Sequence, residues 1–230
     1  MERTSPTPPG AHEESVAAST RAARPTLALL DYGMGNLRSV ARAWEHVGAA
    51  VRIIDGPDGA QSADALVFPG QGAIVDTMER LRETKLDRLI RDWVAADRPF
   101  FGICLGLQAL FTHSEEGDTP GLDIFPGYVR RFRPDPLAGV KVPHMGWNPV
   151  CFPRATNALG AHPPPTAQFY FVHSYFAEPA HPELVFGETD YAGLTFCSAI
   201  ARGRLVATQF HPEKSQQAGL DLYRRFLDAL

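Results

Sequence analysis

One cysteine lies in the setting expected of a catalytic nucleophile. Cys104 follows the apolar run 100–103, has Gly102 and Gly106 two residues away on either side, and precedes residues with helical spacing. Small neighbours tolerate the strained backbone of a sharp strand-to-helix turn, which holds a nucleophile clear of a sheet. A helix N-terminus also favours a thiolate over a thiol. A buried structural cysteine is the alternative, but the two glycines, the strand and the helix together favour a nucleophile.

A thiolate nucleophile needs a neighbouring base. The sequence contains eight histidines, and His211 is the best placed because it closes the apolar run 205–210. Parallel-sheet enzymes hold catalytic groups at such strand ends. Glu213 projects to the same side of an extended backbone and can orient the imidazole. His-Pro-Glu by itself is typical of a surface turn, but in combination with Cys104 it predicts a triad of Cys104, His211 and Glu213.

A glycine-containing loop provides candidate donors for an oxyanion hole. Pro69-Gly-Gln71-Gly72 directly follows the apolar run 65–68. Glycines let backbone N–H groups face a site where a side chain would interfere. We predict that this loop, at Gln71 and Gly72, acts together with the N–H of Leu105, the residue after the nucleophile. A plain turn at a strand end is the alternative.

Two other features could be mistaken for ligand sites. Residues 33–38 have most of a dinucleotide-binding fingerprint, with Asp55 in the place of its acidic residue. Arg38 replaces the third glycine, however, and its bulk would prevent close approach of helix and strand. A nucleotide-binding module therefore remains only an alternative. His144 and His173 lack metal-ligand spacing with cysteines or carboxylates, so we expect packing and hydrogen bonding there and predict no metal site.

Apolar runs predict the elements that position these groups. Strands buried on both faces are expected over residues 26–32, 51–54, 65–68 and 100–103. Helical spacing alternates with them, over residues 37–47, 74–81, 86–94 and 105–111. Asn36 is a candidate N-cap of the first helix, and Thr84 with Asp87 forms a candidate capping box before the third. The alternation predicts an α/β fold with a doubly wound, mostly parallel central sheet flanked by helices.

The second half of the chain predicts an added antiparallel region. Its short apolar runs indicate strands joined by hairpins, over residues 128–132, 168–172, 184–189, 195–200 and 205–210. An amphipathic helix is expected over residues 220–230. The proline-rich residues 151–166 are expected to form a surface loop, and Cys151 and Cys197 to be structural.

Composition restricts the class of protein. The chain has 230 residues, enough for one medium domain, and a formal net charge of −4, which argues against nucleic acid or an anionic membrane as the main partner. Three cysteines do not suggest a disulfide framework, so a cytoplasmic location is expected. Residues 1–24 contain no apolar run and predict a disordered tail before one domain over residues 25–230. No stretch has the length of apolar residues that a membrane span needs.

Several motifs resemble those of one enzyme family. Gly102-Ile-Cys-Leu-Gly-Leu-Gln108 and His211-Pro-Glu213 resemble the motifs of the class I (triad) glutamine amidotransferases. Other segments closely resemble the glutaminase subunits of imidazole glycerol phosphate synthase. These segments are residues 31–37, 170–175 and 207–215, and Lys141-Val-Pro-His-Met-Gly-Trp-Asn148. The resemblance extends from about residue 26 to the C-terminus.

The resemblance implies a glutaminase of histidine biosynthesis. Cys104 would attack the side-chain amide of L-glutamine, forming a glutamyl thioester and releasing ammonia, while His211 relays protons and Glu213 orients it. The positions that match glutamine-binding residues of the family are Gly72, Gln108, Ser174 and Tyr175. No cofactor is implied.

The resemblance also implies a heterodimer with a separate (β/α)₈ cyclase. Ammonia would pass unhydrated to that partner, which makes imidazole glycerol phosphate and an aminoimidazole carboxamide ribonucleotide. The positions that match partner-facing or passage-lining residues are Asn36, Met145, Trp147, Asn148, Tyr170 and Lys214. Low glutaminase activity is expected of the chain without its partner.

The sequence departs from the family pattern at two positions, and two functions besides the nucleotide-binding module remain open. Gln71 stands where relatives more often have an aliphatic residue, and Phe176 where a basic residue is frequent. One alternative is a glutaminase for another synthase, against which the segment around Trp147 argues. The other is a cysteine-based sensor on a related α/β fold, which would not need His211 and Glu213 together.

Overall fold

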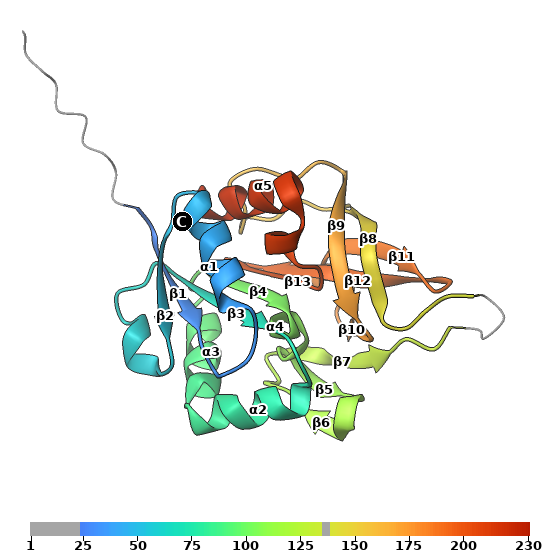
Figure 1. Cartoon of the computed structure of the whole chain (residues 1–230), viewed down its shortest axis with the longest axis horizontal. Helices are drawn as coiled ribbons and strands as arrows, with labels where there is room; N and C mark the ends of the chain where they lie inside the picture. The colour runs from blue at the N-terminus through green and yellow to red at the C-terminus, as the bar shows by residue number, and fades with distance from the viewer. Residues whose placement is uncertain (1–23, 135–138) are drawn as a thin grey trace, which may run out of the picture.

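The parallel half of the sheet is built from four early strands and one late strand (Figure 1). The structure is a computed structural model that describes residues 24–134 and 139–230. The parallel strands, in their spatial order, are β2 (Ala50–Ile54), β1 (Thr26–Leu30), β3 (Ala65–Gly70), β4 (Phe100–Cys104) and β13 (Leu205–Thr208). Helices lie between β1 and β2 and between β3 and β4, and the prediction of a doubly wound α/β fold is confirmed.

A mostly antiparallel region, with one parallel pair of strands, continues the same sheet beyond β13. Its strands are β5 (Phe111–Ser114), β6 (Thr119–Pro120), β7 (Phe125–Arg131), β8 (His144–Cys151), β9 (Thr166–His173), β10 (Tyr175–Pro179), β11 (Val185–Tyr191) and β12 (Leu194–Arg202). The order runs from β13 through β12, β10, β7 and β5 to β6, and β11, β8 and β9 branch from β12. The predicted strand at 205–210 therefore belongs to both halves, since β13 pairs parallel with β4 and antiparallel with β12.

Helices cover both faces of the parallel strands. They are α1 (Leu37–His46), α2 (Ile74–Glu83), α3 (Leu86–Ala95), α4 (Leu105–Gln108) and α5 (Gln216–Leu227), with 3₁₀ turns η1 (Pro57–Ala60), η2 (Glu116–Asp118), η4 (Pro182–Leu184) and η5 (Pro212–Lys214). Alternate strand residues form two cores, one with α1 and α5 and one with α2 and α3 (Figure 1). Trp44 of α1 stacks on Tyr223 of α5 with ring centroids 3.7 Å apart.

Three local predictions are wrong. Thr84 does not cap α3, because its hydroxyl donates to the carbonyls of Arg80 and Leu81 and so ends α2, while Lys85 takes the left-handed turn before α3. The helix predicted over 105–111 ends at Gln108, and β5 begins at Phe111.

The third correction concerns residues 151–166, which form more than a surface loop. Phe152, Ala158 and Leu159 are buried in the core that contains α1 and α5. Cys151 at the end of β8 is exposed, so it has no place in the core, whereas Cys197 is buried.

The predicted N-cap is confirmed, since the side chain of Asn36 accepts a hydrogen bond from the backbone N–H of Ser39. The tail predicted at residues 1–24 lies outside the described residues, apart from Arg24. In the part of the chain that is described, no helix has the length and hydrophobicity needed to cross a membrane.

Candidate active site

The nucleophile candidate lies on a strained turn between strand and helix. Cys104 is the last residue of β4 and has φ 54° and ψ −102°, a conformation that non-glycine residues rarely adopt. Its neighbouring glycines are needed for space, and their own φ angles are not left-handed. A Cβ on Gly106 would collide with the carbonyl oxygen of Phe68, and one on Gly102 would lie 2.8 Å from the Cβ of Ala207. The close packing of three strands around the turn therefore requires both glycines.

Strand register brings the candidate groups to one edge of the sheet. Gly70 of β3 is paired with Cys104 of β4, and Thr208 of β13 is paired with Ile103. Gln209 therefore follows β13 beside Cys104. The oxyanion loop, the nucleophile and the segment that leads to His211 all start from the carboxyl ends of adjacent parallel strands, where α/β proteins hold their ligands.

His211 and Glu213 form a buried pair. The Nδ1 atom of His211 lies 2.8 Å from Oε1 of Glu213, and both side chains are only 2% exposed. The backbone here forms the 3₁₀ turn η5 and is not extended as we expected, yet the turn also brings the two side chains together. The same three residues recur at His181-Pro-Glu183, where the corresponding pair is 3.2 Å apart and both side chains are more than half exposed. Burial therefore distinguishes the candidate triad from a surface turn.

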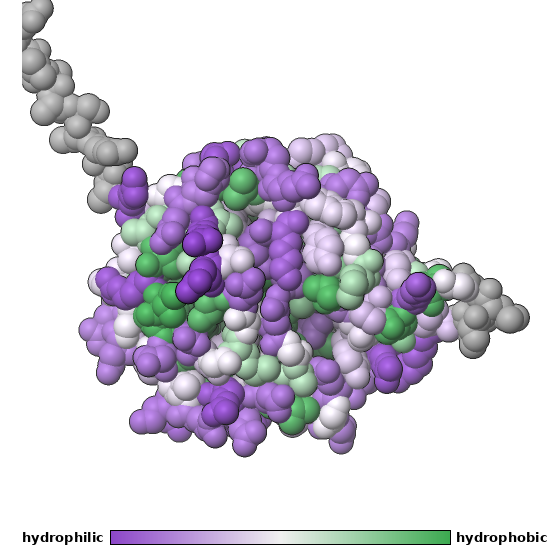
Figure 2. Space-filling model, in the orientation of Figure 1, coloured by the Kyte–Doolittle hydropathy of each residue, from purple (hydrophilic) through white to green (hydrophobic). Residues whose placement is uncertain are grey.

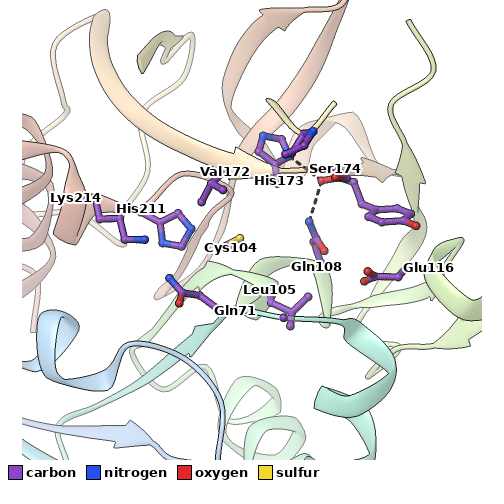
Figure 3. Close-up of a pocket in the computed structure, with 13 residues that line it drawn as sticks. Gln71, Cys104, Leu105, Gln108, Glu116, Val172, His173, Ser174, His211 and Lys214 are labelled. Atoms are coloured by element: carbon purple, nitrogen blue, oxygen red, sulfur yellow. Dashed lines mark hydrogen bonds between the residues drawn. The ribbon is translucent and has the colours of Figure 1, made fainter. Parts of the chain in front are cut away.

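The remaining ring nitrogen of His211 is free to serve the nucleophile. Among the residues that the structure describes, its Nε2 has no hydrogen-bond partner, and Figure 3 shows the sulfur of Cys104 beside the ring. Burial by itself lowers the pKa of His211, but the neighbouring Cys104 thiolate and Glu213 carboxylate outweigh it and raise the pKa to about 10. This electrostatic balance favours the imidazolium form of His211.

One cavity of about 440 Å³ opens onto these groups (Figure 3). Its volume suits a small-molecule ligand. The lining residues are Gln71, Gly72, Cys104, Leu105, Gln108, Glu116, Pro143, Val172, His173, Ser174, Tyr175, His211 and Lys214. The structure thus brings together the residues that we predicted for the nucleophile, its base, the oxyanion hole and glutamine binding. Glu213 lies behind His211, away from the cavity lining.

Two residues at this site escaped the sequence analysis. Nε2 of Gln209 donates a hydrogen bond to Sγ of Cys104 at 3.5 Å. The carboxylate of Glu116 lines the cavity and accepts a hydrogen bond from the N–H of Ile74, the first residue of α2. Gln209 lies two residues before His211 on a segment next to the nucleophile, which is a signal that could have found it. For Glu116, whose contact depends on a loop that returns to α2, the sequence carries no comparable signal.

The predicted oxyanion loop lies against the turn at residues 33–36. Gly72 has φ 108°, and a Cβ on it would collide with the end of the Met34 side chain. The hydroxyl of Tyr32 donates to the carbonyl of Pro69 at 2.8 Å and so holds the end of β3. The turn that resembles a nucleotide fingerprint therefore packs on the loop beside Cys104.

Of the predicted partner-facing residues, Lys214 lines the cavity, and Met145, Trp147 and Tyr170 lie on the neighbouring strands β8 and β9. Met145 and Trp147 of β8 are 62% and 47% exposed, which is unusual for large apolar side chains. Tyr170 of β9 is paired with Trp147, and the ammonium of Lys214 lies 5.9 Å from the centre of the Tyr170 ring. Figure 2 shows a mostly hydrophilic face with separate apolar areas, one of them over β9 beside β8. Because Lys214 also lines the cavity, this surface continues into the candidate site.

His144 and His173 form hydrogen bonds, as we expected. Nδ1 of His144 lies 3.1 Å from Nε2 of His173, and Asn148 lies 3.2 Å from the other nitrogen of His144. The side chain of Asn148 thus bonds to His144, and it also donates to the carbonyl of Asp190. Burial lowers the pKa of His144 to about 4 and that of His173 to about 3, so both are neutral near pH 7. No cluster of three potential metal ligands occurs within residues 24–134 and 139–230.

Solved structures share the fold at low sequence identity. A putative GMP synthase protein from Thermoplasma acidophilum aligns with a TM-score of 0.66 at 19% identity, covering 90% of this chain and 94% of that one. PurLQS from Thermotoga maritima aligns with a TM-score of 0.69 at 15% identity, covering 90% and 98% of the two chains. At these identities the likeness concerns the fold alone.

Sequence relatives carry the comparison further. The imidazole glycerol phosphate synthase subunit HisH of Aromatoleum aromaticum is 49% identical over 208 residues, which cover 87% of this chain and 97% of the relative. The subunit of the same name from Thermosynechococcus vestitus is 48% identical over 203 residues, 88% and 96% of the two chains. The family described as Glutamine amidotransferase class-I matches residues 28–229. The chain therefore belongs to the class-I glutamine amidotransferases and, among them, to the family of imidazole glycerol phosphate synthase HisH subunits.

Proposed function

We propose that this protein hydrolyses L-glutamine to glutamate and ammonia as the glutaminase subunit of imidazole glycerol phosphate synthase. The observation that carries the proposal is the buried His211–Glu213 pair, whose free ring nitrogen faces Cys104 in a cavity of about 440 Å³. The HisH relatives, which are named as subunits of that synthase, support the same assignment. The alternative of a cysteine-based sensor gives no role to the His211–Glu213 pair.

The chemistry begins with the thiolate of Cys104. Its sulfur attacks the side-chain amide carbon of glutamine, and the N–H of Leu105 with the backbone of Gln71 and Gly72 stabilises the oxyanion. The imidazolium of His211 then protonates the departing nitrogen, so that ammonia leaves and a glutamyl thioester remains. Neutral His211 next accepts a proton from water, whose oxygen attacks the thioester. Glutamate leaves, and the thiolate and imidazolium are restored.

The cavity offers groups that suit an amino acid. The carboxylate of Glu116 complements the α-ammonium of glutamine, and its second oxygen remains bonded to α2 through Ile74. Gln108 donates to the carbonyl of Tyr175, and Ser174 lies in the turn between β9 and β10. Ser174 and Tyr175 line the same cavity, where they contact the substrate main chain.

The ammonia serves a cyclase partner. At neutral pH free ammonia in water is mostly ammonium, which is not nucleophilic, so a dry route to the acceptor preserves the reactive form. Met145 and Trp147 provide exposed apolar area for such an interface, and Lys214, which lines the cavity, connects it to the candidate site. Asn36, Asn148 and Tyr170 are the further residues that we propose for the interface or the ammonia passage. The partner is a (β/α)₈ cyclase that forms imidazole glycerol phosphate and an aminoimidazole carboxamide ribonucleotide. The location is cytoplasmic, which suits three cysteines that form no disulfide.

The test is a glutaminase assay of the chain with and without the cyclase and its nucleotide substrate. We expect little glutamine turnover by the chain alone and a large increase in the complex. Cys104→Ala and His211→Ala should each abolish that turnover, whereas a sensor would lose function only with the cysteine. Full turnover by the isolated chain would contradict the coupling to a partner. Binding of NAD or ATP to the isolated chain would instead favour a nucleotide-binding module.

A further inference from the structure

The side chain of Gln209 contacts the sulfur of the candidate nucleophile. The side-chain nitrogen of Gln209 lies 3.5 Å from Sγ of Cys104, a normal distance for a hydrogen bond to the large sulfur atom, and both residues are buried. The contact follows from the sheet, because Gln209 leaves β13 next to Cys104 at the end of β4. The backbone of Gln209 is held as well, since its N–H donates to the carbonyl of Ser198 at 2.8 Å.

The orientation of the Gln209 amide is set by the backbone carbonyl of Tyr175, to which it is connected through the side chain of Gln108. The carbonyl of Tyr175 can only accept, so the Gln108 amide must turn its nitrogen toward it, at 2.9 Å (Figure 3). The second hydrogen of that nitrogen donates to Oε1 of Gln209 at 3.0 Å. The nitrogen of Gln209 is thereby directed at Cys104. A reversed Gln209 amide would place two N–H groups against each other and an oxygen against a thiolate.

We propose that Gln209 is a further catalytic residue, which donates an N–H to the sulfur of Cys104 and stabilises its anionic form, while Gln108 is the positioning residue that holds the Gln209 amide. The proposal rests on the proposed glutaminase function. A hydrogen bond to an ionised acceptor favours the ionised form, so the N–H of Gln209 stabilises the thiolate in addition to the neighbouring imidazolium of His211.

The same contact helps the second half of the reaction. The sulfur of the glutamyl thioester carries no negative charge, so its hydrogen bond from Gln209 is weak. When water attacks and the carbon–sulfur bond breaks, the electron pair stays on the sulfur and the full charge-assisted hydrogen bond returns. Gln209 therefore makes the thiolate a better leaving group and assists hydrolysis of the thioester.

The test measures ionisation of Cys104 without using glutamine turnover. In the full chain bound to the cyclase, the rate of iodoacetamide labelling at Cys104 is followed against pH by mass spectrometry of the Cys104 peptide. Gln209→Met keeps the length of the side chain and removes the donor, and we expect the midpoint of the profile to rise by about one to two pH units. Gln108→Met should raise it less, because it frees the Gln209 amide to rotate. Gln217→Met, on the exposed face of α5, is the matched control and should leave the midpoint unchanged.

A second variant keeps the proposal testable if Gln209→Met fails to fold. Gln209→Glu has nearly the shape of glutamine but replaces the N–H donor with a carboxylate, and both the lost donor and the added negative charge should raise the midpoint. The role of Gln209 would be overturned if a folded Gln209→Met or Gln209→Glu protein had a midpoint within 0.3 pH units of the wild-type value. That margin corresponds to about 0.4 kcal/mol. If the wild-type complex then still hydrolyses glutamine, the glutaminase function stands without Gln209. If the wild-type complex does not hydrolyse glutamine, the proposed function itself fails, whatever the labelling profile.

Discussion

Removing the charge of Glu213 should move the pH dependence of the enzyme in a calculable direction. Oε1 of Glu213 lies 2.8 Å from Nδ1 of His211, and water reaches neither side chain appreciably. A hydrogen bond to a charged group contributes about 1.5–3 kcal/mol. Because one pH unit corresponds to 1.36 kcal/mol, Glu213→Gln should lower the pKa of His211 by roughly one to two pH units.

The sign follows from which form of His211 acts first. The imidazolium, favoured by a pKa of about 10, protonates the departing nitrogen, so activity is present below that pKa and is lost above it. In Glu213→Gln the alkaline limb of kcat/KM should therefore shift to lower pH by the same one to two units. At pH 7.5 kcat should fall at least about tenfold, because the amide also fails to hold the imidazole in the required tautomer.

The assay is a pH series of glutamine turnover by the complex with the cyclase. Glu183→Gln is the matched control, because His181 and Glu183 form the same sequence motif and a 3.2 Å pair on the surface, where exposed pairs contribute little. This variant should leave both kcat and the alkaline limb unchanged. An alkaline limb that stays in place for a folded Glu213→Gln protein would refute the argument that Glu213 sets the charge of His211.

Three further predictions concern the packing around Gly106, the binding of glutamine and the binding of the cyclase. Gly106→Ala should lower the free energy of unfolding by at least about 2 kcal/mol in urea titrations, because its Cβ would collide with the backbone of Phe68, whereas Gly56→Ala, with open space around it, should change it little. Glu116→Gln should raise KM for glutamine about tenfold or more while kcat changes less, since a charge partner of the α-ammonium is lost. Trp147→Ala should weaken binding of the cyclase at least tenfold in calorimetric titrations without lowering Tm. Ile53→Ala, at a similarly exposed residue of β2, should change neither the affinity for the cyclase nor Tm.

The sequence was most informative where chemistry and local backbone coincide. The apolar run before Cys104 and the helical spacing after it lie within a few residues, so the strand-to-helix turn could be predicted without tertiary information. The two neighbouring glycines supported that prediction for the wrong reason. They are needed because Phe68 and Ala207 of the flanking strands approach the turn closely, and this proximity depends on a register that no local pattern encodes.

Features could not be predicted from the sequence where a side chain has several possible contacts within the chain and only the fold selects one. The hydroxyl of Thr84 suits the start of α3 and the end of α2 equally well in sequence, and only the folded helices decide that it donates to Arg80. His-Pro-Glu occurs twice, and nothing inside the motif says that His211 becomes buried while His181 stays exposed. Glu116 reaches the cavity because η2 returns to the N-terminus of α2, a long-range contact of the same kind.

The base of the proposed triad is also tied to the proposed partner surface by backbone hydrogen bonds. The N–H of His211 donates to the carbonyl of Tyr170 at 2.9 Å. The N–H of Tyr170 donates to the hydroxyl of Ser215, which in turn donates to the carbonyl of His211. One closed set of hydrogen bonds thus joins the backbone of Tyr170 to the backbone of His211. A displacement of β9 at Tyr170 must therefore either move His211 or break these bonds, so the position of the base depends on the surface where we place the cyclase.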